Sequence, residues 1–185
     1  MACAEGRRDA GSREVTPSRR HVLQIGGGIL AGLAWPRLSL AGSPAEIRMQ
    51  GKADGSHVWF DPIGLHVQPG ETIRWINLDP GNSHTATAYH PKNFDRPLRI
   101  PEDAAPWNSD YLLPNEAFSV TLRVEGVYDF FCIPHEHAGM VGRIVVGNPG
   151  SHSPKESAGQ ALPDIALQAF PSIDEIMQQS VVRRT

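Results

Sequence analysis

Cysteine is scarce in this chain of 185 residues, with one at position 3 and one at position 132. Long apolar runs are also missing. The best candidate, residues 22–35, has about 14 residues, whereas a membrane-spanning helix needs about 20. Basic residues do not exceed acidic ones, at 17 against 20. These shortages exclude a disulfide-rich scaffold and a membrane-embedded helical bundle.

The first 41 residues are predicted to form an export signal. Arg19 and Arg20 precede the weakly apolar run 22–35, which is typical of a bacterial twin-arginine signal, and Ser39-Leu40-Ala41 has the small-x-small pattern of a cleavage site. No cysteine lies at this cleavage site, so a lipoprotein anchor is not expected. A basic leader or an uncleaved anchor is the alternative. We therefore expect contact with the twin-arginine export machinery, cleavage, a periplasmic location and no stable membrane insertion afterwards.

Removal of this leader changes the charge and the cysteine count. Residues 42–185 hold eleven basic and seventeen acidic residues, a net charge of −6. That charge argues against nucleic acid or an anionic membrane as partner, and it is compatible with docking onto a basic patch of a redox protein. Cys132 is then the single thiol. An unpaired thiol in an oxidising compartment is reactive unless something occupies it, and a metal ion would do so.

Strand-like segments separated by Pro and Gly turns fill residues 42–147. Segments 72–76 and 118–122 alternate apolar and polar side chains, which is the period of a half-buried strand. The predicted strands are 46–50, 58–60, 65–67, 71–77, 83–90, 117–124, 127–132 and 141–146. Seven or eight short strands with no helix between them predict an all-β fold, an antiparallel sandwich.

Two segments depart from this rhythm. Residues 91–114 contain five prolines and predict a long ordered loop with one helical turn near 102–105, acting either as a lid beside a functional site or as a flap over a sandwich edge. Residues 148–185 predict a linker followed by helices at 163–168 and 172–179, with Ser172 capping the second. This tail either packs on the sandwich or binds a partner. The predicted organisation is thus 1–41, 42–147 and 148–185.

A short loop at the end of the strand 127–132 carries most of the chemistry. Cys132, His135 and Met140 follow one another in the order Cys-x2-His-x4-Met, and His84 stands 48 residues upstream of the cysteine, after a dense turn signal. A proline at position 134 stiffens the loop. His137 competes with His135, but it would leave only two residues before the methionine. A thiolate, two imidazoles and a distant thioether are the donors of a blue-copper site, which predicts one copper ion held by His84, Cys132, His135 and Met140.

Three segments carry a family resemblance: Val67-Gln68-Pro69-Gly70-Glu71-Thr72, then Ser83-His84-Thr85, then Gly126-Val127-Tyr128-Asp129-Phe130-Phe131-Cys132 with the ligand loop. Over residues 45–147 the chain resembles the plastocyanin/pseudoazurin group of cupredoxins. The resemblance implies a Greek-key β-sandwich with a type 1 copper at one end, held by the same four residues. It also implies a backbone N–H that supports the thiolate from the segment after the first histidine, and an apolar docking patch around the edge of His135.

These features together predict an electron carrier rather than an enzyme. Its partners would be redox proteins such as a cytochrome or a copper or quinoprotein oxidoreductase. One alternative is copper acquisition or delivery, although such proteins tend to carry exposed Met-rich sites and residues 42–185 hold three methionines. Another is a subunit of an oligomeric copper oxidoreductase, with a further copper bound by His90 or His137. Copper stoichiometry distinguishes these possibilities.

Overall fold

The structure is a computed structural model that describes residues 44–52, 54, 57–150 and 161–184. The predicted export signal and most of the predicted linker lie outside these residues. Two units are distinguished, residues 1–40 and 41–185, and every described residue belongs to the second. Among the described helices, none is long and apolar enough to cross a membrane.

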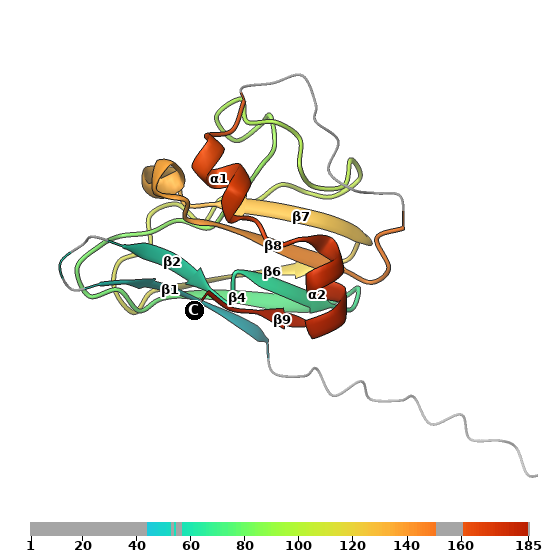
Figure 1. The fold of residues 1–185 in the computed structure, drawn as a ribbon, viewed down its shortest axis with the longest axis horizontal. Helices are drawn as coiled ribbons and strands as arrows, with labels where there is room; N and C mark the ends of the chain where they lie inside the picture. The colour runs from blue at the N-terminus through green and yellow to red at the C-terminus, as the bar shows by residue number, and fades with distance from the viewer. Residues whose placement is uncertain (1–43, 53, 55–56, 151–160, 185) are drawn as a thin grey trace, which may run out of the picture. The chain divides into compact units, whose positions relative to one another are not determined.

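The described chain forms two packed β-sheets (Figure 1). The first has the strand order β2-β1-β4-β6, and the second has the order β5-β7-β8-β3-β9. The strand bounds are β1 Ala45–Gly51, β2 Val58–Asp61, β3 Gly64–Val67, β4 Glu71–Asn77, β5 Thr87–Ala88, β6 Ala117–Leu122, β7 Gly126–Phe131, β8 Val141–Val146 and β9 Val181–Val182. The predicted all-β sandwich is confirmed.

The core lies between the sheets because alternate side chains of each strand point inward. In β4, Ile73 and Trp75 are fully buried while their neighbours are half-buried. Trp75 makes an edge contact with Phe130 of β7, with ring centroids 5.4 Å apart. Burial of such aromatic rings supplies much of the stabilisation of a sandwich of this size.

Three details of the strand prediction were wrong. The predicted strand 83–90 is reduced to β5, because His84 pairs with Leu112 of the long loop instead. Thr87 of β5 also bridges to the long loop, at Asn108. The sandwich is not purely antiparallel, since β1 pairs with β4 and β3 pairs with β8 in parallel. These partners are joined by crossovers between sheets rather than by hairpins. The strand β9 was missed because two residues carry no period.

The long loop 91–114 packs as part of the sandwich and also reaches the predicted site. Its Trp107 and Ile100 are buried in the main core. The expected helical turn near 102–105 is only a hydrogen-bonded turn, in which the Ala104 N–H donates to the Pro101 carbonyl at 2.9 Å. At its far end, Leu112 exchanges two backbone hydrogen bonds with His84, at 2.8 and 3.1 Å. The loop therefore fixes the backbone of a predicted ligand.

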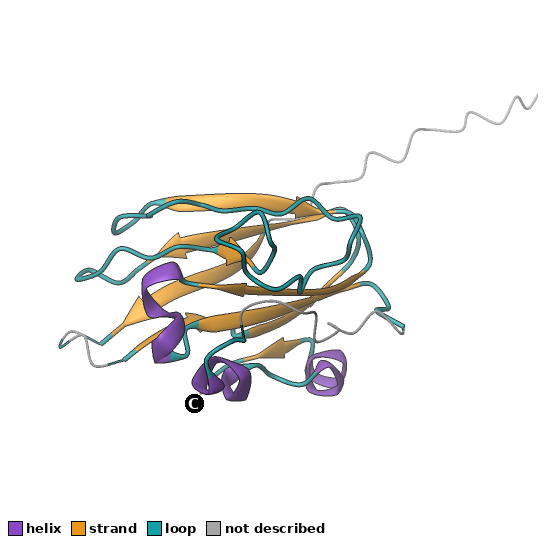
Figure 2. Cartoon of the chain, turned by 90° about the horizontal axis from the view of Figure 1, so that it is seen from above, coloured by secondary structure: helices purple, strands orange, loops and turns teal. Residues whose placement is uncertain are grey.

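The C-terminal tail packs against the second sheet (Figure 2). Helix α1, Asp164–Ala169, buries Ala166 against Phe131 and Val141, and helix α2, Ile173–Gln179, buries Ile176 against Val145. The predicted cap of α2 is confirmed, because the Glu175 N–H donates to the hydroxyl of Ser172 at 3.1 Å. This cover contributes to the burial of Phe131 in β7, a strand in which every residue is buried.

Candidate metal centre

The ligand loop is a single closed turn between β7 and β8. Cys132 follows β7, and a 3₁₀ segment, η1 Ile133–Ala138, leads to Gly139. The Cys132 N–H donates to the Met140 carbonyl at 3.0 Å, and the Met140 N–H donates to the His135 carbonyl at 3.1 Å. Gly139 ends the turn with φ of 76°, in the left-handed region that glycine tolerates best. These bonds hold the three loop residues in a fixed relation.

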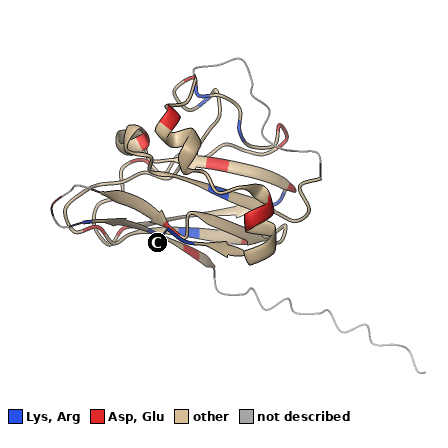
Figure 3. Ribbon diagram, in the orientation of Figure 1, with Lys and Arg blue, Asp and Glu red and all other residues tan. Residues whose placement is uncertain are grey.

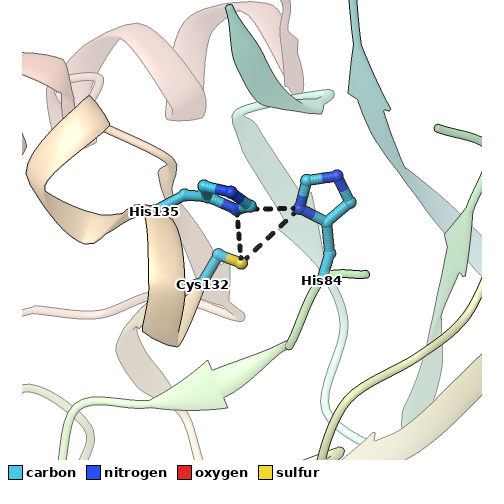
Figure 4. Close-up of side chains that lie close together, drawn as sticks. All are labelled: His84, Cys132 and His135. Atoms are coloured by element: carbon cyan, nitrogen blue, oxygen red, sulfur yellow. Dashed lines mark hydrogen bonds between the residues drawn. The ribbon is translucent and has the colours of Figure 1, made fainter. Parts of the chain in front are cut away.

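Three predicted ligands meet at one point (Figure 4). The His84 Nδ1 and His135 Nδ1 atoms are 3.1 Å apart, and the Cys132 Sγ atom lies 3.6 Å from the first and 3.4 Å from the second. A point equidistant from the three atoms lies about 2.0 Å from each, close to the 2.0–2.3 Å of metal–nitrogen and metal–sulfur bonds in protein sites. The triangle therefore has the dimensions of a trigonal His₂Cys metal site.

The fourth predicted ligand, Met140, is fully buried and shares the main core cluster with Cys132. Its backbone forms hydrogen bonds with the backbones of Cys132 and His135. His84 and Cys132 are also fully buried, whereas His135 is half-buried. His135 is therefore the one member of the predicted set that reaches solvent.

The other histidines among the described residues lie apart from this group. His137 is exposed, and His90 Nδ1 accepts a hydrogen bond from the Lys92 N–H at 3.0 Å. His66 Nε2 lies 2.9 Å from the Gly147 carbonyl, and His57 stacks on Trp59. His152 lies outside the described residues. Of the two competing loop histidines, the structure brings His135 to the cysteine.

Burial sets the protonation of the donors. It raises the pKa of the Cys132 thiol to about 11, partly offset by backbone hydrogen bonds from Thr85 and His135. Burial also lowers the pKa of His84, an effect that Asp79 opposes. Burial and the positive charge of a protonated His84 both lower the pKa of His135. At neutral pH the imidazoles are thus neutral with a free lone pair. The thiol holds its proton until a cation displaces it, so metal binding would release a proton.

The residue after His84 supports the sulfur. The Thr85 N–H donates to Cys132 Sγ at 3.3 Å, which is the backbone donor that the family resemblance implies. The Thr85 hydroxyl also accepts the Ile133 N–H at 2.9 Å. One threonine therefore joins the two halves of the site, from the His84 segment to the ligand loop.

Asp79 is the residue that the sequence pattern did not single out. It is 2% exposed, and its Oδ2 atom lies 3.0 Å from His84 Nε2, on the side of the ring away from the sulfur. In the sequence it reads as one member of the turn Asp79-Pro80-Gly81-Asn82. The available signal was an acidic residue five positions before a ligand histidine.

Residues 47–147 match the model of a family described as copper binding proteins, plastocyanin/azurin family. The chloroplast plastocyanin of Oryza sativa subsp. indica is 35% identical over 152 residues, which cover 77% of this chain and 88% of that protein. The plastocyanin of Tetradesmus obliquus is 29% identical over 137 residues, or 72% and 86% of the two chains. A solved pseudoazurin from Sinorhizobium has 27% identity and a TM-score of 0.51, covering 74% of this chain and 98% of that one.

Proposed function

The chain belongs to the plastocyanin/azurin family of copper-binding proteins, and we propose that it is an electron carrier with one type 1 copper held by His84, Cys132, His135 and Met140. The observation that carries this proposal is the triangle of Nδ1, Nδ1 and Sγ atoms with edges of 3.1 to 3.6 Å. Bound copper supplies a one-electron Cu(II)/Cu(I) couple to such a site.

The protein's own contribution is to keep the donors still. His84 is fixed by Leu112, Cys132 by Thr85 and Met140, and the loop turn by its internal hydrogen bonds. Donors held in one arrangement suit both oxidation states, so little rearrangement accompanies the transfer of an electron. The fully buried positions of His84 and Cys132 also argue against a site that hands its metal to another protein.

Electrons would enter and leave through His135, because it is the ligand with solvent exposure. We propose redox proteins as partners, either a cytochrome or a copper or quinoprotein oxidoreductase. Acidic and basic residues are interspersed along the described chain in the view of Figure 3. The exposed Pro134 and Ala138, which lie beside His135 in the ligand loop, favour an apolar contact there. The proposal includes twin-arginine export and a periplasmic location.

Expression of the full chain in a bacterial host, followed by copper analysis of the purified periplasmic protein, tests this function. We expect one copper per chain, an intense visible band from thiolate-to-copper charge transfer, and reversible one-electron reduction. A colourless protein, or one with several weakly absorbing coppers, would contradict the proposal and favour copper storage or delivery. Recovery of the protein only from the cytoplasm would contradict the predicted export.

Variants of the loop test the ligand assignment. Cys132→Ser is expected to abolish the band while circular dichroism still reports a folded sandwich. His135→Ala is expected to remove or strongly shift the band. His137→Ala is the matched control, because it makes the same change two residues further along the same loop, at an exposed side chain. If the two histidine variants behave in reverse, the assignment of His135 is wrong.

A further inference from the structure

A buried carboxylate lies behind His84. The Oδ2 atom of Asp79 is 3.0 Å from His84 Nε2, and the two side chains are 2% and 0% exposed. Among the ion pairs of the described residues, Asp79 is paired with this histidine and with no lysine or arginine. The backbone of β1 also closes over the carboxylate, because a Cβ atom at Gly51 would lie within 2.0 Å of Oδ2. The contact is therefore shielded from solvent.

Three polar groups face the carboxylate. The Gly81 N–H donates to Oδ1 at 2.9 Å, the Asn82 side-chain amide donates to Oδ2 at 2.8 Å, and His84 Nε2 is the third neighbour. The two donors, the Gly81 N–H and the Asn82 amide, favour the ionised form of the carboxylate. An ionised carboxylate can only accept, so His84 Nε2 is the donor and His84 is the tautomer with hydrogen on Nε2.

This tautomer leaves the lone pair of His84 on Nδ1, the atom that faces Cys132 and His135. Asp79 itself is held by its own N–H, which donates to the Asn77 side chain at 2.9 Å. The Asn77 amide in turn donates to the Leu112 carbonyl at 2.9 Å, beside the Leu112–His84 bridge. The orientation of the ring is therefore fixed from both its backbone and its far nitrogen.

We propose that Asp79 is a positioning residue of the metal centre, which fixes the tautomer of His84 and biases the bound copper toward its more positive oxidation state. This inference rests on the copper site proposed above. A negative charge that is buried, without a neighbouring cation, and one imidazole ring away from the metal-binding nitrogen favours Cu(II) over Cu(I). It therefore lowers the reduction potential.

The test is the reduction potential of the copper-loaded full-length protein and of its Asp79→Asn variant. The substitution keeps the size of the side chain and removes the charge. We expect the ratio of Cu(II) affinity to Cu(I) affinity to fall at least tenfold, which is a rise in potential of about 59 mV or more. Asp110→Asn is the matched control, because it removes an exposed charge from the segment that pairs with His84. That control is expected to change the ratio less than twofold.

The outcomes separate the two proposals. A wild-type protein without the charge-transfer band would overturn the copper site and this inference with it. A band in both proteins, with an unchanged potential in Asp79→Asn, would overturn the role of Asp79 alone. If the variant does not fold, proton–nitrogen correlation spectra of the Cu(I)-loaded wild type test whether the His84 Nε2–H is held by Asp79. We expect the His84 Nε2–H signal to exchange more slowly with solvent than that of His135, and rapid exchange at His84 would overturn the inference.

Discussion

Arg96→Met is expected to lower the free energy of unfolding of the copper-free protein by about 3–5 kcal/mol. Arg96 belongs to the long loop, and its Nη2 atom lies 2.6 Å from Oε2 of Glu136. Glu136 stands in the ligand loop between His135 and Met140, and it is fully buried. The substitution keeps much of the aliphatic bulk of the arginine but leaves a buried carboxylate without its cation. This ion pair is therefore the charged link between the 91–114 loop and the ligand loop.

The magnitude follows from burial. After the change, Glu136 retains the Tyr89 hydroxyl as a donor at 2.8 Å, and one neutral hydrogen bond does not offset the loss of a cation in a dry setting. The exposed pair Arg48–Glu46 is the matched control, with an Nε–Oε1 distance of 3.1 Å and side chains 51% and 38% exposed. Arg48→Met is expected to cost about 1 kcal/mol or less, because water screens both of its charges.

The assay is urea unfolding of the copper-free protein, followed by tryptophan fluorescence, with a reductant present to protect Cys132. Copper is left out because a ligand that binds the folded state would add its own stabilisation. A cycle of Arg96→Met, Glu136→Gln and the double variant then gives the coupling energy, expected to be about 1–3 kcal/mol. A cost of Arg96→Met under about 1 kcal/mol, or single costs that add to within about 0.5 kcal/mol, would refute the reasoning.

Three further predictions concern the ligand, the core and the pH range. Met140→Leu is expected to keep the visible band and raise the reduction potential, and a fall measured by voltammetry would tell against an axial thioether. Gly142→Ala would place a Cβ atom 2.3 Å from the Phe130 ring, and we expect urea unfolding to show a loss of about 1–3 kcal/mol. Burial raises the pKa of Tyr128 from 10.0 to about 12. Its neutral form thus stabilises the fold below pH 10, and that contribution is lost as the pH rises to about 12. Tyr128→Phe should therefore lose less stability than the wild type over this interval.

The ligand loop could be interpreted from the sequence because everything that shapes it is local. The spacing from Cys132 to Met140 is short, Pro134 stiffens its start, and Gly139 permits the left-handed turn at its end. The choice of His135 over His137 depended on the same short geometry. The alternating pattern of β4 was equally readable, because each inward side chain of a strand is two residues from the next.

The remaining fold depended on contacts between distant segments. Residues 83–90 have the composition of a strand, but hydrogen bonds to Leu112 and Asn108 divert them to the long loop. No residue near His84 indicates that it pairs with Leu112, which lies 28 positions away. Likewise, no pattern in the sequence indicates that the last described residues add a strand, β9, to the edge of β3. Partner choice is a property of the assembled sheets, so the period of one segment cannot supply it.

Asp79 is a different case, because it lies only five residues before His84 and the sequence still does not indicate their contact. An aspartate in a Pro-Gly turn has a sufficient explanation in turn chemistry alone, since its side chain caps the backbone two residues on, as it does for Gly81. Only the burial of the Asp79 side chain, within a turn whose Pro80 and Gly81 are exposed, makes its carboxylate a partner for His84. The net charge of −6 over residues 42–185 does not indicate this contact either, because exposed charges are screened over about 10 Å of salt solution. One acidic residue enclosed beside a ligand should therefore influence the copper more than the exposed charges that dominate the count.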